Sequence, residues 1–163
     1  EIILASVGDE LCLCDWNEMP CAERNKLRLL RYIKAEFKIE TSSILEQTKK
    51  QLDEYFNGNR KTFDIPLHPV GTDFQKKVWN ALLDIPYSET RSYKEIAISM
   101  GTPNGTRSVA GAIGSNGISI LIPCHRVIGS NHSLTGFAGG LTTKRFLLEL
   151  EAEQKQHKML IFK

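Results

Sequence analysis

Two short runs of apolar residues at the start of the chain predict a β-hairpin. The runs are Ile2–Val7 and Leu11–Trp16, and the Gly8-Asp9 pair between them is a frequent turn sequence. Further along, apolar residues recur at near-helical spacing over Arg24–Phe37. We therefore expect a two-stranded unit followed by a first helix.

The capping-box pattern is a Ser or Thr followed three residues later by Glu or Gln, and it marks helix starts. It begins at Ser43, Thr72 and Ser92. Gly58 and Gly101 follow the first and last of these helices, at a position where glycine often ends a helix. Two more helices are expected, one from 102 to about 115 and one from about residue 142 onward.

Three other segments are predicted to be strands or loops. Thr62–Leu67 is expected to be an edge strand, because Pro66 within it cannot donate a backbone hydrogen bond. Ile118–Ile122 is a continuous apolar run, which predicts a buried strand. The glycine-rich segment Gly129–Gly140 is expected to be a loop.

The element order predicts an α/β (α+β) protein of two domains. Residues 1–70 would form a small sheet-plus-helix domain, and residues 71–163 a mostly helical domain with a helix-turn-helix and an active-site strand. The charge changes sign at this boundary. Residues 1–70 hold 10 Lys/Arg against 12 Asp/Glu, whereas residues 71–145 hold 8 against 4. The basic middle of the chain permits a nucleic-acid surface without requiring one.

The two short helices around Gly101 have the spacing of a helix-turn-helix, although this pattern alone is weak. The second of them is rich in Gly, Ala and Ser and has one long cation, Arg107. An interior glycine costs a helix about 1 kcal/mol, so the small residues need a reason. They permit close approach of another backbone, and Arg107 suits a probe pushed into a DNA duplex. The alternative for Arg107 is an ordinary surface salt bridge.

Several protein classes are excluded by the sequence. No apolar run approaches the roughly 20 residues that a membrane helix needs. Neither a dinucleotide-binding glycine motif nor a phosphate-binding loop is present, and we expect no cofactor. Cys12, Cys14 and Cys21 match no common zinc spacing, so we expect buried inert thiols and no metal. With no secretion signal, a reducing intracellular compartment is expected.

Cys124 is the strongest candidate for chemistry. It follows the buried Ile118–Ile122 run and a proline, and His125 and Arg126 come directly after it. Neighbouring cations lower the pKa of a thiol. Because adjacent residues of an extended chain point to opposite faces, His125 would act as a base through a bridging water. A distant carboxylate such as Glu151 could orient the imidazole.

The hexapeptide Ile-Pro-Cys-His-Arg-Val at Ile122–Val127 resembles the active-site signature of the O6-alkylguanine-DNA alkyltransferases. The resemblance extends over roughly Gly71 to Glu151. It includes the Gly71-Thr72-x-Phe74-Gln75-x-x-Val78-Trp79 motif, Ser92-Tyr93, the Arg107 helix, Asn116 and Gly139-Gly140-Leu141. The first 70 residues match the family only loosely.

The resemblance implies roles for the reacting residues. Cys124 would be the alkyl acceptor, activated by His125 through a water, with Glu151 hydrogen-bonded to His125. Tyr93 would donate a hydrogen bond to the leaving guanine. Arg107 would fill the gap left by the flipped nucleotide.

The resemblance also implies a DNA face and a substrate pocket. Thr106, Ser108 and Gly111 would lie at the DNA, with Asn116 as the hinge between the DNA-binding helices and the active-site strand. Backbone atoms around Cys124, Val127 and Ala138 would read the base edge. Phe137 stands where tyrosine is frequent and Ala138 where some members have serine, which affects the preferred alkyl group and inhibitor and not the reaction.

The function implied is DNA repair by irreversible, single-turnover transfer of an alkyl group from O6 of guanine to Cys124, with O4 of thymine as a second substrate. The partner would be double-stranded DNA, bound in the minor groove with the guanine flipped out, by a monomer in the cytoplasm or, in a eukaryote, the nucleus. No membrane contact is expected. Two alternatives are a Cys-His hydrolase and a non-catalytic helix-turn-helix regulator. The hydrolase would not explain the small-residue helix, and the regulator would not explain Pro-Cys-His-Arg.

Overall fold

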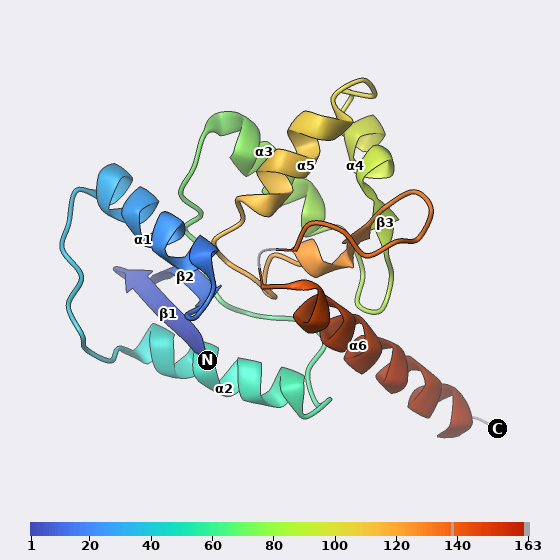
Figure 1. Cartoon of the computed structure of the whole chain (residues 1–163). Helices are drawn as coiled ribbons and strands as arrows, with labels where there is room; N and C mark the ends of the chain where they lie inside the picture. Colours follow the sequence, from blue (N-terminus) through green and yellow to red (C-terminus); the bar gives the residue numbers. More distant parts are fainter. Residues whose placement is uncertain (138, 162–163) are drawn as a thin grey trace.

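The computed structural model describes residues 1–137 and 139–161, with side chains described as far as residue 154. The chain contains both helices and short strands, as expected for a mixed α/β protein (Figure 1). In order, the elements are β1 Ile2–Val7, β2 Glu10–Trp16, α1 Pro20–Ile33, α2 Ser43–Phe56, α3 Asp73–Leu82, β3 Arg91–Ser92, α4 Tyr93–Ser99, α5 Thr106–Gly114, the 3-10 turn η1 Cys124–Arg126, β4 Val127–Ile128 and α6 Leu141–Ile161. No helix in the described ranges is both long enough and apolar enough to cross a bilayer.

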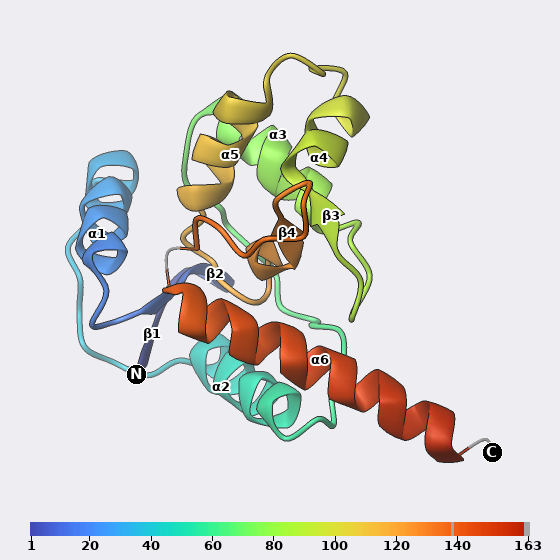
Figure 2. The same cartoon turned by 45° about the vertical axis from the view of Figure 1, so that its right-hand side comes forward.

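The predicted hairpin is confirmed, and α1 and α2 flank it (Figures 1 and 2). Strands β1 and β2 pair antiparallel with a bulge between Ala5 and Ser6. Gly8 has a φ of 56°, a backbone conformation that favours glycine in a tight turn. The inner strand β2 is the more buried of the two, since five of its seven residues are buried.

The first two helices form where they were expected, but their ends differ. Helix α1 begins earlier than Arg24, at Pro20, whose fixed φ suits the first helical position. It ends at Ile33, because Lys34 adopts a left-handed conformation with a φ of 54°. Helix α2 is capped by Ser42 and not by Ser43, since the Ser42 hydroxyl accepts the Leu45 N–H.

The two predicted single strands are wrong. Thr62–Leu67 pairs only through an isolated bridge from Leu67 to Leu11. Ile118–Ile122 is buried but folds back on itself, with the Ile122 N–H donating to the Ile118 carbonyl at 3.1 Å and Ile120 at a φ of 72°. A run of apolar residues indicates that a segment is buried, but a buried turn has the same pattern as a buried strand. The expected active-site strand is therefore a compact turn that precedes Cys124.

Helices α3, α4 and α5 form one cluster, and α4 and α5 make the predicted helix-turn-helix (Figure 1). The capping boxes at Thr72 and Ser92 are both confirmed. Gly101, with a φ of 76°, turns the chain after α4. Helix α5 starts later than expected, at Thr106, with Gly105 as its N-cap.

Helix α6 contacts both the η1 turn, in the second part of the chain, and helix α2, in the first part. It starts at Leu141, beside η1, and passes along α2, where the rings of Phe56 and Phe146 stack at 6.5 Å between centroids (Figure 2). One hydrophobic core includes residues from the first 70 positions, such as Leu11 and Tyr55, together with Trp79 and Leu147. This shared core holds the residues around Cys124 from both sides.

Candidate active site

The Cys124 thiol lies at the start of the η1 turn and is held by Asn116. The Asn116 side-chain amide donates to Cys124 Sγ at 3.2 Å and also to the carbonyls of Ile118 and Ile122, at 3.3 and 3.1 Å. Asn116 Oδ1 accepts the Ile118 N–H. The buried Ile118–Ile122 turn therefore fixes the Asn116 side-chain amide, and this amide in turn positions the Cys124 sulfur. Asn116 is only 2% exposed, so its side chain is buried and bound within the protein.

Burial dominates the acidity of the thiol. Cys124 is 5% exposed, and desolvation raises its pKa to about 11 although the Asn116 hydrogen bond and the charge of Lys144 lower it. The expectation that Arg126 lowers the thiol pKa is wrong, because its guanidinium is turned to the Glu151 carboxylate. The thiol therefore needs a base to become a nucleophile at neutral pH.

Glu151, on α6, is fully buried and accepts hydrogen bonds from three parts of the chain. Arg126 donates through Nε at 3.0 Å to Oε2 and through Nη2 at 2.9 Å to Oε1. The Tyr55 hydroxyl and the Ser88 N–H donate at 2.8 and 3.1 Å. Burial would raise the pKa of Glu151, but the hydrogen bonds from His125 and Arg126 and the charge of Arg126 outweigh it and hold the pKa at about 2. The carboxylate is ionised at every pH of interest.

His125 is fully buried, directly follows Cys124 in the chain and contacts the Glu151 carboxylate. Its Nε2 lies 2.8 Å from Glu151 Oε1, as the sequence implied. Its Nδ1 is buried and has no hydrogen-bond partner among the described residues. Burial lowers the pKa of His125 although Glu151 opposes this, so the imidazole is neutral and can accept a proton. With Nε2–H pointing to the carboxylate, Nδ1 is the accepting atom.

Tyr93 and Lys144 also lie close enough to the thiol to interact with it electrostatically. The Tyr93 hydroxyl donates to the Thr135 carbonyl at 2.8 Å, and burial raises the pKa of Tyr93. Lys144 Nζ donates to the carbonyls of Val127 and Thr135 and lies 5.7 Å from the centre of the Tyr93 ring. Lys144 is fully buried, and desolvation lowers its pKa to about 8. This lysine ties the Gly129–Gly140 loop to the Tyr93 ring.

The expected pocket residues are placed in part. Val127 is buried, and its N–H and carbonyl are bonded within the protein, to Cys124 O and Lys144 respectively. The Phe137 ring packs edge-on against Trp16, with centroids 6.4 Å apart. Ala138 lies outside the described residues. Trp16, at the end of β2, thus supports Phe137.

Helix α5 presents a bare face to solvent. Arg107, Ser108 and Gly111 are exposed on it, and Thr106 is half-buried. Arg107 makes no ion pair within the described part of the chain, so the salt-bridge alternative is not supported. A Cβ atom added at Gly111 would meet nothing within 4 Å. The glycine is therefore not needed for packing within the described structure.

Comparison with known proteins decides the family. The model of the 6-O-methylguanine DNA methyltransferase DNA-binding domain matches residues 73–153, and that of its ribonuclease-like domain matches residues 1–69. The chain belongs to the 6-O-methylguanine DNA methyltransferase family. The resemblance seen in the Ile122–Val127 hexapeptide is thereby confirmed.

Relatives of this methyltransferase family member are similar along most of their length. The methylated-DNA–protein-cysteine methyltransferase of Methanosarcina barkeri is 55% identical over 113 residues, which are 69% of this chain and 72% of the relative. The constitutive enzyme of Bacillus subtilis is 54% identical over 108 residues, 66% of each chain. The crystal structure of the Mycobacterium tuberculosis O6-methylguanine methyltransferase is 40% identical, with a TM-score of 0.81, and covers 94% of this chain and 87% of its own. A second structure from that organism is a complex with DNA, with a TM-score of 0.79, 40% identity and the same coverage.

Sequence reasoning missed four contributors to the methyltransferase site. Tyr55 and Ser88 bind Glu151, Lys144 holds the loop, and Trp16 supports Phe137. Tyr55, Ser88 and Trp16 carry no local sequence signal, because each comes from a different element and reaches the site only through the fold. The sole hint is Lys144 itself, a cation in the first turn of a helix, where the helix dipole disfavours it.

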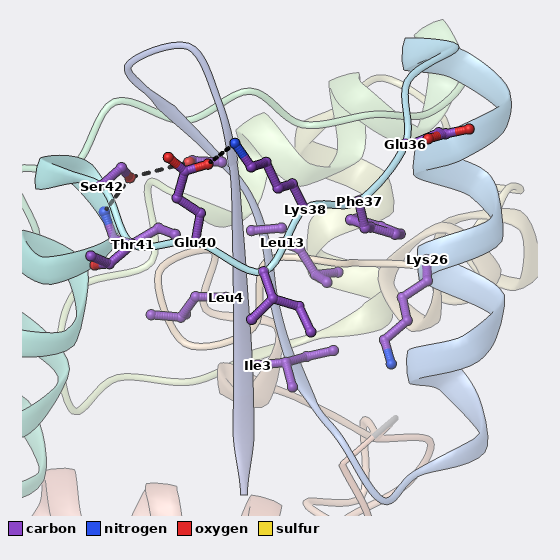
Figure 3. Close-up of a pocket in the computed structure, with 14 residues that line it drawn as sticks. Ile3, Leu4, Leu13, Lys26, Glu36, Phe37, Lys38, Glu40, Thr41 and Ser42 are labelled. Carbon is purple, nitrogen blue, oxygen red and sulfur yellow. Dashed lines mark hydrogen bonds and ion pairs between the residues drawn. The ribbon is translucent and has the colours of Figure 1, made fainter.

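A surface hollow of about 730 Å³ lies elsewhere on the molecule, between the hairpin and the segment before α2 (Figure 3). Apolar side chains such as Ile3, Leu4 and Phe37 line it, together with the Lys38–Glu40 ion pair. It holds no cysteine and no histidine, and it shares no residue with the Cys124 site.

Proposed function

We propose that Cys124 of this family member accepts the alkyl group from O6 of guanine in double-stranded DNA, once per molecule. The observation that carries the assignment is the buried Glu151–His125 pair, whose His125 Nδ1 has no partner in the described structure and which follows a buried thiol directly in the chain. A neutral histidine fixed by a carboxylate is the arrangement that activates nucleophiles in many enzymes.

The reaction follows from these contacts. His125 Nδ1 takes the thiol proton through a bridging water, which offsets the raised pKa of Cys124. The sulfur then attacks the alkyl carbon, an S–C bond forms and the C–O6 bond breaks, so the electron pair leaves with guanine. The Tyr93 hydroxyl exchanges its Thr135 partner for the leaving base and supplies a hydrogen bond to it. The product thioether does not undergo thiol exchange, so the protein is not regenerated.

The α5 face supports the DNA side of the proposal. Exposed small residues let a duplex backbone approach the helix, and Arg107 is available to replace the stacking of an extruded nucleotide. Ser115 and Asn116 follow α5 directly, so DNA docked on the helix would be close to the Cys124 site. We place Thr106 and Ser108 at the DNA backbone in the minor groove, and Val127, Phe137 and Ala138 around the flipped base, with thymine alkylated at O4 as a second substrate.

Domain division and location belong to the same proposal. We divide the chain near residue 70, with the helix-turn-helix and the acceptor cysteine in the second domain. A DNA substrate places the protein in the cytoplasm of a prokaryote or the nucleus of a eukaryote, acting as a monomer.

Excess duplex DNA containing O6-methylguanine is expected to add one methyl group per protein molecule, on Cys124. Intact-protein mass spectrometry would count the methyl groups, and peptide mapping would locate them. An undamaged duplex of the same sequence is the control. Repeated turnover would contradict the single-use mechanism and favour a hydrolase, and an unmodified Cys124 after repair would contradict the assignment.

Arg107→Ala is expected to slow repair of duplex DNA about tenfold or more relative to its effect on the free base, because only the duplex requires extrusion of a nucleotide. Tyr93→Phe is expected to slow both reactions alike, since Tyr93 serves the leaving group. Single-turnover rates with O6-methylguanine duplex and with free O6-benzylguanine would separate the two cases. Arg145→Ala, which removes an exposed cation of α6, is the charge-matched control. Equal losses on both substrates for Arg107→Ala would refute a role in extrusion.

A further inference from the structure

Helix α1, in the first part of the chain, contacts the short segment that carries Asn116. Arg28 Nη2 donates to the Ser115 carbonyl at 2.6 Å, directly before Asn116. The same nitrogen donates to Asn25 Oδ1 at 2.9 Å, which fixes the guanidinium. Arg24, one turn earlier on α1, donates to the Gly114 carbonyl at 3.0 Å. Two arginines of α1 therefore bind the carboxyl end of α5, where cations are favoured by the helix dipole.

Packing on the other side of Asn116 also comes from the first part of the chain. A Cβ atom at Gly117 would lie 3.2 Å from Arg28 Nη2, so the Gly117 backbone packs closely against the arginine. The Cys14 N–H donates to the Gly117 carbonyl at 2.9 Å, and the Ser119 N–H donates to the Cys14 carbonyl at 2.7 Å. The residues on both sides of Asn116 are thus held by β2 and α1.

Arg28 is itself anchored in a buried polar network. Asn25, which accepts from Arg28, donates to Asp15 Oδ2 at 2.6 Å, and Asn25 and Asp15 are 1% and 0% exposed. The Arg28 guanidinium also lies 5.5 Å from the centre of the Trp79 ring. The Arg28 Nη2 atom thus has two partners, the Asn25 side chain and the Ser115 carbonyl, which restrict the guanidinium to one geometry although its buried Nε has no partner in the described structure. Arg28 is therefore a fixed support for Ser115 and not a mobile surface cation.

We propose that Arg28 is a positioning residue for alkyl transfer, because it holds Ser115 so that the Asn116 amide stays on the Cys124 sulfur. This inference rests on the proposed role of Cys124 as the alkyl acceptor. Arg28 touches neither the sulfur nor the base. Arg28 acts through the Ser115 carbonyl, the peptide that links Ser115 to Asn116, and the Asn116 side-chain amide. The reactivity of Cys124, in the second part of the chain, therefore depends on helix α1 of the first part.

Arg28 can also affect the pKa of the thiol through its charge. The experiment must separate this charge effect from the effect of Arg28 on the position of the Asn116 amide. The titratable groups that act on Cys124 are Lys144 from α6, Asp15 and Cys14 from β2, and Tyr93 from α4. Asp15 also interacts with Arg28, so removing the arginine would leave the Asp15 charge less compensated. A positional effect needs the Asn116 amide, whereas a charge effect through Asp15 does not.

The test is the pH dependence of Cys124 alkylation by iodoacetamide, with the modified residue identified by mass mapping. In this reaction the sulfur displaces iodide, so no DNA is involved. Arg28→Met is expected to move the pH midpoint up by about one unit and to slow alkylation at neutral pH about tenfold, because a thiol without its amide donor ionises less readily. Arg28→Lys should restore part of the rate, and Arg31→Met, an exposed arginine of the same helix, should change nothing.

The decisive measurement adds Asn116→Ala. In that background Arg28→Met should have no further effect on the midpoint, since the amide through which it acts is gone. A one-unit shift that persists without Asn116 would show that Arg28 acts by charge and would overturn the proposal, as would an unchanged midpoint in Arg28→Met alone. Wild-type protein that fails to take a methyl group from O6-methylguanine DNA would instead contradict the proposed function, so the two failures are distinguishable.

Discussion

Cys124→Ala is expected to abolish alkyl transfer and to leave the fold and the DNA affinity nearly unchanged. Transfer ends because the sulfur is the only atom that forms the new bond. The fold persists because Asn116 Nδ2, which loses its contact with Sγ, still donates to the carbonyls of Ile118 and Ile122. No buried donor is left unsatisfied, so the cost in unfolding free energy should be about 1 kcal/mol.

Three measurements on Cys124→Ala would check this expectation: methyl uptake by mass spectrometry, affinity for an O6-methylguanine duplex, and unfolding in urea. Cys12→Ala is a matched control, because Cys12 is also a buried thiol, with the same 5% exposure, but lies on β2. Residual transfer in Cys124→Ala, or its loss in Cys12→Ala, would place the acceptor elsewhere. Loss of DNA binding in Cys124→Ala would show that the thiol also supports the DNA-binding helices.

Glu151→Gln is expected to damage both stability and chemistry. The neutral amide leaves the buried guanidinium of Arg126 without its counter-charge, and breaking a buried ion pair in this way costs about 3–5 kcal/mol. The glutamine NH2 group would also face the Tyr55 hydroxyl and the other hydrogen-bond donors around residue 151, so some of these donors would lose their acceptor. His125 loses the partner that fixes its tautomer, so alkylation of Cys124 should slow by about 100-fold or more.

The stability effect of Glu151→Gln should depend on pH in a defined direction. The folded protein holds the pKa of Glu151 at about 2, below its ordinary value of 4.5. The ionised carboxylate therefore contributes its stability fully above about pH 4.5, and this contribution is lost as the pH falls toward 2. Urea unfolding of wild type and Glu151→Gln at several pH values should show a gap that is largest near neutrality and narrows in acid.

Glu149→Gln is the control for this series, because Glu149 is an exposed carboxylate on the same helix. It should change neither the unfolding free energy nor the transfer rate. A gap between wild type and Glu151→Gln that stays constant down to pH 2 would mean that folding does not lower the pKa of Glu151. Normal alkylation by Glu151→Gln would remove the carboxylate from the mechanism.

Sequence patterns of a few residues correctly predicted the turns and helix starts that depend only on neighbouring residues. The hairpin at Gly8 and the capping boxes at Thr72 and Ser92 formed as expected, because a turn or a cap depends on residues within a few positions. The box at Ser43 was one residue off, since Ser42 offers the same hydroxyl. The Ile118–Ile122 strand failed for the opposite reason. The segment turns back on itself, with Ile122 donating to Ile118, and it is held in place by Cys14, which lies about a hundred positions away in the sequence.

The sequence by itself determined the family and pointed to Cys124 as the candidate acceptor, because Pro-Cys-His-Arg and the surrounding motifs are contiguous or regularly spaced. The pairing of His125 with Glu151 was implied by resemblance. Only the tertiary structure decided what surrounds that pair: Arg126 facing Glu151, Tyr55 and Ser88 completing the carboxylate, and Lys144 on the loop. The physical reason is burial. Charged groups removed from water must find partners at hydrogen-bond distance, and those partners come from whichever elements the fold brings near.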